Sequence, residues 1–286
     1  MAISSSSGSF SFAAGEQHFI PEIFSKKLQA KFYKQTVLAE VTNNDYEGEI
    51  SGQGDKVNIR TVPSVTVADY AGSLTYADVT SSTVELNINK AKSYAFKVDD
   101  ILKRQADIDY MSAAAEDAAN NMKIAIEADV FENALGDFGQ TVLNNGETAM
   151  TSANILGTII DAGKNLDVSN IPEEGRYFIV SPTEAALLKQ SELRQAYLTG
   201  DNTSPLRNGF IGMVDRFKVY VSNNLYTAGS ITYGIYGHPK ALAYASQFTN
   251  TETVRLESSF GDGVRGLAVY GYKTVVPSAI GYVKML

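Results

Sequence analysis

The sequence predicts an α+β protein, and three observations lead to that class. Apolar and polar residues alternate over 84–98, which is typical of one long extended strand. An alanine-rich stretch from Ser112 to Leu135 repeats apolar residues every three or four positions, as one face of a helix does. From about residue 151 onward, short apolar runs of the buried-strand type alternate with helical segments.

The composition excludes several classes of function. The chain has 286 residues, 44% of them hydrophobic, which is enough to bury one or two cores. There is no cysteine, so disulfides and thiolate zinc sites are impossible. The formal net charge of −8 makes the chain a poor non-specific binder of nucleic acid, whose affinity comes mainly from Lys and Arg. No apolar run is long enough for a membrane span, and the N-terminus does not resemble a signal peptide, so we expect a chain made in the cytoplasm.

The first segments are predicted to form an arm. The Ser- and Gly-rich stretch 1–18 has little to bury. A helical stripe follows over 19–41, where Pro21 suits a first helical turn. The stretch 42–56 is rich in turn residues and reads as a linker.

A projecting β-hairpin is predicted over 50–97. In its first strand, Val57 and Ile59 alternate with polar residues. The second strand, 84–98, would span ~50 Å if fully extended at about 3.3 Å per residue. This exceeds the usual length of a strand, so we expect it to project from the domain or to bend. The connecting stretch 63–82 is rich in Ser, Thr, Gly and Ala, and it has little to contribute to a core.

One long helix is predicted from about 106 to 135, where Gly136 closes it; a shorter helix is expected before it, within 98–110. Its length would be ~45 Å at 1.5 Å per residue. The expected apolar face consists of Ile108, Met111, Ala115, Ala119, Met122, Ile126 and Val130. The expected outward stripe consists of Glu116, Asn120, Lys123 and Glu127.

The second half is predicted to be a compact α/β region that starts near residue 150, and near 259 the chain returns to the first domain. A helix is expected from Thr151 or Ser152 to about 166. Ser181, Pro182 and Glu184 form the pattern of a capping box at the start of another helix. The expected strands are 176–180, 216–225, 230–237 and a final pair broken at Pro277, with a further helix at 238–248.

Several sequence patterns are typical of catalytic or binding sites, but none of them is predicted to form one here. The segment 261–266, GDGVRG, matches a dinucleotide-binding motif, but no βαβ unit can follow it, so a turn is predicted. His238 is expected to cap a helix or turn, and His18 lies in the arm. The adjacent acids are predicted to be solvated or to lie at helix starts, namely Asp99–Asp100, Glu116–Asp117 and Glu173–Glu174. No catalytic, cofactor-binding or metal-binding residue is therefore predicted, and no cofactor. A mild basic cluster on the hairpin is interpreted as a patch that faces a partner, with a plain solubilising surface as the alternative: Lys56, Arg60, Lys90 and Lys92.

The order of these elements resembles the major capsid (coat) protein of tailed bacteriophages, which has the HK97-type fold. The resemblance covers nearly the whole chain. It rests on 94–131 (YAFKVDDILKRQADIDYMSAAAEDAANNMKIAIEADVF) and on 270–285 (YGYKTVVPSAIGYVKM), with RYFIVSPTEAALL (176–188) and GFIGMVDRFKVYVSNNL (209–225) between them.

The resemblance implies a structural role and a division of the chain. Residues 1–49 would be the N-terminal arm and 50–97 the E-loop. Residues 98–150 with 259–286 would be the peripheral domain, which holds the spine helix, and 151–258 the axial domain. The family builds icosahedral shells from hexamers and pentamers around double-stranded DNA, without sequence-specific binding. The implied location is the virion capsid, assembled in the host cytoplasm.

The resemblance also implies partners. No long helical prodomain precedes the arm, so a separate scaffolding protein is expected. A portal is expected too, and a decoration protein is a further candidate partner. Some relatives crosslink covalently through Lys and Asn, but nothing in the sequence identifies a partner Asn for Lys90 or Lys92, so no crosslink is predicted.

Two rival functions remain open at this point. One is an encapsulin-like compartment shell of the same fold, which would enclose an enzyme cargo instead of DNA. The other is a soluble enzyme with an unrecognised site. A shell protein should form megadalton particles, whereas an enzyme should form a small oligomer.

Overall fold

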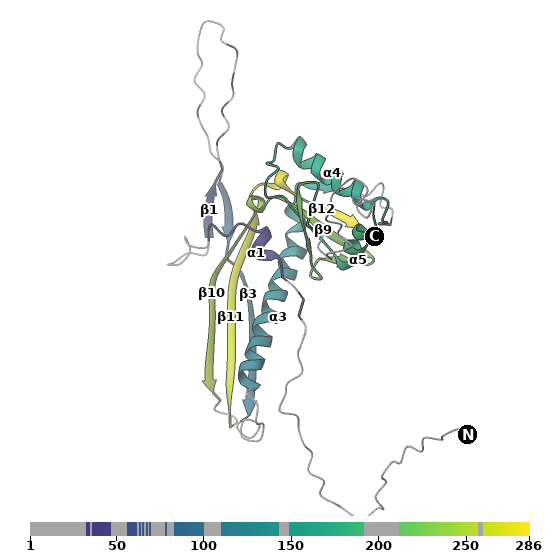
Figure 1. Ribbon diagram of the computed structural model, residues 1–286. Coiled ribbons are helices and arrows are strands. Elements are labelled where there is room, and N and C mark those ends of the chain that lie inside the picture. Colours follow the sequence, from purple (N-terminus) through teal and green to yellow (C-terminus); the bar gives the residue numbers. More distant parts are fainter. Residues whose placement is uncertain are drawn as a thin grey trace, which may run out of the picture. The chain divides into compact units, whose positions relative to one another are not determined.

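The computed structural model describes residues 33–46 apart from 35, 56–61, the positions 63, 65, 67, 69 and 78, and then 83–99, 110–142, 149–191, 212–256 and 260–286 (Figure 1). These residues belong to one compact unit, Phe32–Leu286. Within the described residues the strands form three sheets of two, three and seven strands.

The two-stranded sheet is the base of the predicted hairpin. Strands β1 (Lys56–Arg60) and β2 (Thr83–Asn87) pair antiparallel, from Lys56 opposite Asn87 to Arg60 opposite Thr83. Ile59 and Leu86 are buried, while their neighbours along each strand are mostly exposed. The predicted pairing of these strands is confirmed, and most of the connecting stretch 63–82 lies outside the described residues.

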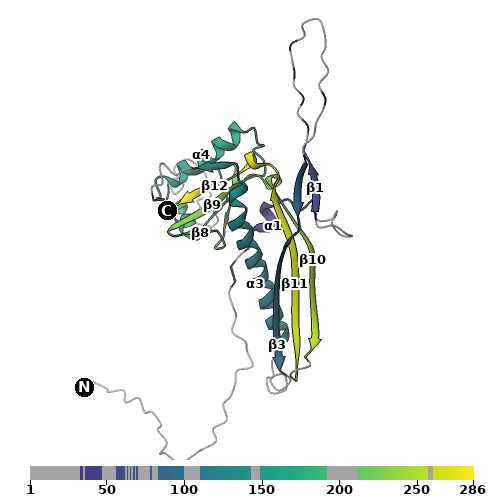
Figure 2. The ribbon, with the colours of Figure 1, turned by 180° about the vertical axis from the view of Figure 1, so that it is seen from behind.

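The three-stranded sheet has the order β10-β11-β3 and is antiparallel throughout. Its strands are β3 (Lys90–Asp99), β10 (Leu242–Arg255) and β11 (Gly261–Thr274), which lie side by side in Figures 1 and 2. Only Ile88 and Asn89 separate β2 from β3. The predicted strand 84–98 therefore bends there and changes its pairing partner from β1 to β11, although its alternation continues to Val98.

The long helix α3 (Tyr110–Asn133) has 24 residues and contacts β3 of the three-stranded sheet (Figure 2). A short 3-10 helix, η2 (Leu135–Asp137), follows it. The predicted long helix is confirmed over these residues, while the short helix expected before it lies outside them. Burial is concentrated in the second half of α3, where Ile126, Val130 and Phe131 are buried, whereas Ala119 on the expected apolar face is exposed.

The seven-stranded sheet has the order β4-β12-β9-β5-β7-β6, with β8 paired to β9. Its strands are β4 (Gln140–Val142), β5 (Tyr177–Val180), β6 (Met213–Val214), β7 (Phe217–Val221), β8 (Thr227–Ala228), β9 (Ile231–Gly237) and β12 (Ile280–Met285). Helices α4 (Ile155–Val168) and α5 (Pro182–Gln190) share a hydrophobic core with this sheet, built around residues such as Ile159, Leu188 and Phe217. The helix predicted from residue 151 or 152 and the strand predicted at 176–180 are thus confirmed in type and place.

A second core joins segments that are distant in sequence. The short helix α1 (Leu38–Val41) buries Leu38 and Val41 against the second half of α3 and against residues of both larger sheets, such as Ile235 and Tyr270. Residues 33, 34, 36 and 37 are not helical, so the described part of the predicted helix 19–41 is helical only at α1. The 3-10 helix η5 (Pro277–Ala279) introduces β12.

Two local predictions are wrong. The helix expected at 238–248 is a single 3-10 turn, η4 (Pro239–Ala241), followed by β10. The GDGVRG segment is the beginning of β11, not a turn. In both segments the pairing between β10 and β11 decides the conformation, and that pairing is not encoded in either segment alone.

Candidate functional site

The acidic and histidine candidates within the described residues do not converge on a reactive site, and His18 and Asp100 lie outside those residues. Among the described residues there is no group of three His, Asp or Glu side chains that could hold a metal. Glu173 pairs with Arg216, and Asp117 accepts hydrogen bonds from Tyr33 and Asn121. No helix in the described part of the chain is long and apolar enough to cross a membrane.

His238 has the capping role that the sequence predicts. It is the N-cap of η4, and its Nδ1 accepts a hydrogen bond from the Lys240 backbone N–H at 3.2 Å. Burial, together with the nearby charges of Lys240 and Arg176, lowers its pKa, although a backbone hydrogen bond at Glu174 opposes the shift. A mostly neutral imidazole can accept this bond at neutral pH.

Lys90, which the basic-patch interpretation places against a partner, is bound within its own subunit. Its Nζ lies 3.1 Å from Oδ2 of Asp129 on α3, donates to the Tyr272 hydroxyl, and lies 4.4 Å from the centre of that ring. Partial burial opposes the charge, but the bonds to Tyr272 and Asp129 outweigh it and raise the pKa of Lys90. The Tyr270 hydroxyl also donates to Asp129, at 2.9 Å. Lys90 therefore fastens β3 and β11 to α3, and Lys56 pairs with Glu85 within the hairpin.

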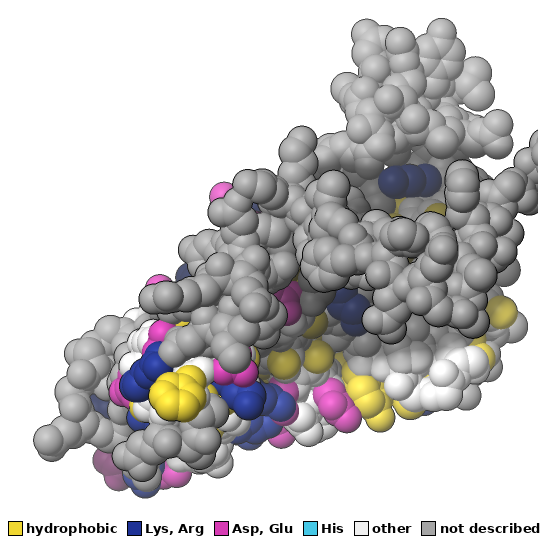
Figure 3. All heavy atoms as spheres, turned by 90° about the horizontal axis from the view of Figure 1, so that it is seen from below, with side chains coloured by type: hydrophobic (Ala, Val, Ile, Leu, Met, Phe, Trp, Pro, Cys, Tyr) yellow, Lys and Arg dark blue, Asp and Glu magenta, His cyan; other side chains and the backbone are white. Residues whose placement is uncertain are grey.

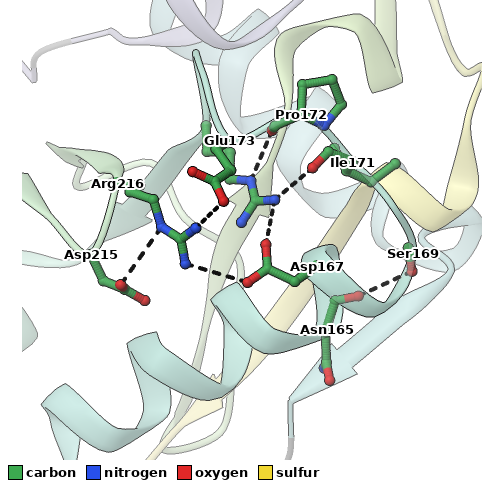
Figure 4. Close-up of polar contacts among 9 residues, drawn as sticks. Asn165, Asp167, Ser169, Ile171, Pro172, Glu173, Asp215 and Arg216 are labelled. Atoms are coloured by element: carbon green, nitrogen blue, oxygen red, sulfur yellow. Dashed lines mark hydrogen bonds and ion pairs between the residues drawn. The ribbon is translucent and has the colours of Figure 1, made fainter.

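A buried arginine, Arg176, organises the end of α4, and Figure 4 labels its partners Asp167, Ile171 and Pro172. Arg176 has no exposed side-chain surface; it donates from Nε to the Pro172 carbonyl at 2.9 Å and from an Nη to the Ile171 carbonyl at 2.6 Å. The same Nη lies 2.7 Å from Asp167, whose pKa is lowered mainly by the hydrogen bond from Arg176. Asp167 also binds Arg216 at 3.3 Å.

Arg216 belongs to the tight turn between β6 and β7. Asp215 and Arg216 have φ angles of +45° and +68°. Non-glycine residues adopt such angles rarely, mostly in tight turns. The contacts of Arg216 with Asp167, Glu173 and Asp215 stabilise this conformation, as Figure 4 shows. The network is a structural clamp between α4 and the sheet.

Glu127 is the clearest departure from the sequence prediction. It was expected on the outward stripe of the helix, yet its exposed fraction is 0%. Its Oε2 accepts from the backbone N–H groups of Val37, at 2.6 Å, and Leu38, at 3.0 Å. Its Oε1 accepts from Ser222 Oγ and Asn224 Nδ2, both at 2.9 Å. Helical periodicity could not identify this residue, because the groups that cover it come from distant segments.

The candidate contact surface lies on the three-stranded sheet. A groove of about 570 Å³ is lined by residues of β3, β10 and β11, among them Phe96, Val254 and Val264. A second groove of about 400 Å³ lies between β3 and α3, where alanines of the helix leave space. Beside the β10–β11 connection, Phe260 is 82% exposed. In the view of Figure 3, apolar side chains lie beside both acidic and basic ones. This mixture suits a protein interface better than a catalytic cleft.

Comparisons with known proteins identify what this architecture is similar to. The family model described as phage capsid protein matches residues 81–285. Among solved structures, a chain of Mycobacterium phage Che8 is 33% identical, with a TM-score of 0.82 over 93% of this chain and 97% of that chain. The capsid of cyanophage P-SCSP1u is 14% identical, with a TM-score of 0.74 over 94% of this chain and 93% of that one. The capsid of a native GTA particle is 11% identical, with a TM-score of 0.68 over 95% and 97%. The last two likenesses concern the fold alone. A comparison with curated proteins finds no match.

Proposed function

The chain belongs to the phage capsid protein family, and we propose that it assembles through hexamers and pentamers into a closed shell around double-stranded DNA. It is a structural protein of the bacteriophage capsid with an HK97-like fold. The observation that carries the proposal is the 33% identity to the Mycobacterium phage Che8 chain, because it extends over 93% of this chain and 97% of that one. The encapsulin-like alternative is not favoured, because the matching family is that of phage capsids.

The division of labour within the subunit is part of the proposal. Residues 1–49 would be the arm, 50–97 the E-loop, 98–150 with 259–286 the peripheral domain, and 151–258 the axial domain. The β1–β2 hairpin and α3 support the second and third assignments. Two strand pairings link the proposed peripheral and axial domains, because β10 pairs with β11 and β9 pairs with β12.

The net charge of the chain agrees with a shell that does not bind the enclosed DNA tightly. With a net charge of −8, the subunit is a poor non-specific binder of DNA phosphates, and the proposal includes no sequence-specific contact with the enclosed DNA. The further partners in this proposal are a separate scaffolding protein, a portal and a decoration protein, with assembly in the host cytoplasm. Mass spectrometry of purified particles tests each partner.

The full chain, expressed alone and with candidate scaffolding proteins, tests the function. We expect closed shells or ring-shaped capsomers, because contacts between non-identical surfaces generate rings when the rotation closes. Sedimentation followed by negative-stain microscopy measures this. A uniform monomer under all these conditions contradicts the proposal.

The E-loop assignment has its own test. Replacing 63–82 by Asn-Gly, which joins Val62 to Thr83, keeps a plausible hairpin turn. The variant should fold, because the buried side chains of the hairpin lie at its base, among them Ile59, Leu86 and Ile88. It should form no closed shell, because the part that would reach a neighbour is gone. Full-sized stable shells contradict the assignment, and a large fall in the melting temperature shows that the segment belongs to the core.

A further inference from the structure

Residues 33–43, which we name the strap, cross the subunit and contact each of its larger parts. Tyr33 donates to Asp117 on α3 at 2.9 Å. Lys34 donates to the Asn223 carbonyl at 3.2 Å, just beyond β7. At the other end of the strap, the Asn43 N–H donates to the Leu242 carbonyl at 2.8 Å, and the Tyr244 N–H donates to the Asn43 carbonyl at 3.0 Å. The strap thereby joins α3, the seven-stranded sheet and the three-stranded sheet.

Apolar burial alone does not define where the strap lies. Val37, Leu38 and Val41 are buried in the shared core, but hydrophobic contact is non-directional, so a shifted strap could bury similar area. Hydrogen bonds to fixed backbone groups remove that freedom. Glu127 binds the N–H groups of Val37 and Leu38 with one oxygen and the side chains of the 222–224 loop with the other, so one carboxylate holds both segments.

Stability is a poor explanation for a carboxylate at this position. A buried charge carries a large desolvation penalty, and well-packed apolar groups often replace buried ionic groups without loss. The better-attested use of a buried polar group is to select one register among several. A shifted strap would bring other N–H groups to Glu127 and would also move Val37 and Leu38 within the core, so the carboxylate and the apolar contacts together favour the observed register.

We propose that Glu127 is a positioning residue that fixes the register of the strap, and through it the place from which the chain before Tyr33 starts. This inference rests on the proposed function, since a shell needs each arm to start from a defined place. Without Glu127 the subunit still folds, but its arm starts from a variable position and assembly becomes irregular.

The full chain with Glu127→Ala tests the proposal. Glu127→Gln is the conservative variant. Glu132→Ala, at an exposed position of the same helix, is the control. Glu127→Gln can keep four bonds if the Asn224 amide rotates and the Ser222 hydroxyl turns to accept from the new NH2 group. Hydrogen–deuterium exchange should become roughly tenfold to hundredfold faster at Val37 and Leu38 in Glu127→Ala. The Asn43 amide, on the far end of the strap, should also exchange faster, which a purely local bond would not cause.

Assembly provides the decisive comparison. Glu127→Ala should give broken or mixed-size particles, whereas Glu127→Gln and Glu132→Ala should give uniform ones. Leu188→Ala, in the separate core of α4 and α5, lowers stability without touching the strap and should also assemble uniformly. Uniform shells from Glu127→Ala overturn the proposal, and so do irregular shells from an equally destabilised Leu188→Ala.

Two further outcomes, failure of the unmodified chain to form particles and failure of Glu127→Ala to fold, can be distinguished from failure of the proposal. If the unmodified chain forms no particles, the proposed function fails, while exchange at Asn43 still decides whether Glu127 controls the strap. If Glu127→Ala does not fold, Lys34→Ala combined with Glu40→Ala cuts two exposed contacts of the strap, to Asn223 and Tyr220. That variant keeps Glu127, so it should keep its melting temperature and assemble uniformly; irregular shells from it overturn the proposal, because the exposed contacts would then set the register.

Discussion

Replacing Gly271 by Ala should detach the base of the hairpin from β11. A Cβ at this position would lie 2.1 Å from the carbonyl oxygen of Asn87 and 2.9 Å from the Cα of Ile88. Both neighbours are backbone atoms, and ordinary contact begins at 3.4 Å, so the two segments must separate by roughly 1 Å. The bend between β2 and β3 can lie across β11 only because residue 271 has no side chain.

The expected loss follows from the side chains that this separation uncovers. Leu86 and Ile88 are buried, and complete exposure of either costs about 1.5–3 kcal/mol. Partial exposure of both, together with about 1–3 kcal/mol for overpacking, gives an expected loss of about 2–4 kcal/mol. Urea denaturation measures the loss, and hydrogen exchange should locate it in β2. An unchanged midpoint with unchanged exchange in β2 contradicts this account of the crossing.

Three other substitutions have clear expected outcomes. Gly157→Ala, on an exposed face of α4 where the added Cβ meets nothing within 4 Å, should stabilise the protein by about 0.4–1 kcal/mol in the same denaturation assay. Ile126→Asp places a carboxylate in the shared core and should remove at least about 3 kcal/mol; a wild-type melting temperature would refute the assigned helix face. Asp167→Asn should lower stability at pH 7. Because Arg176 lowers the folded-state pKa of Asp167, its contribution is present above the unfolded pKa of about 3.9 and is lost as the pH falls through the lower folded value. Melting curves of the two proteins should therefore converge in strong acid, and a constant difference would be inconsistent with this pairing.

Periodicity predicted the elements better than their partners. The alternation of residues 84–98 correctly indicated extended backbone, but it continues unchanged through the bend, because a strand that changes partners keeps the same face buried. The helix wrongly expected at 238–248 illustrates the same limit. Ala241, Leu242, Ala243 and Ala245 are all buried, and an apolar run of this kind suits either a helix or a buried strand.

The contacts of the buried polar side chains could not be predicted either, for a related reason. Ser181 was recognised as an N-cap because its partners lie within three residues, and the structure confirms that its side chain accepts from the Thr183 N–H. Glu127 bonds to groups about 90 residues away in either direction, so its local pattern resembles that of any solvated glutamate. The partners of Arg176 lie nearby, at Asp167, Ile171 and Pro172, yet nothing in this stretch of sequence indicates that its charge is buried.

The place of β12 within its sheet has a consequence for biosynthesis. This strand lies between β4 and β9, so it connects two parts of the seven-stranded sheet that do not pair with each other. It is also translated after every other strand of that sheet. A nascent chain that has not yet released residues 280–285 from the ribosome leaves the facing edges of β4 and β9 unpaired, and pairings over such sequence separations form slowly. Completion of the sheet therefore waits for nearly the whole subunit, and an unfinished chain cannot present the finished lattice-forming surface to its neighbours.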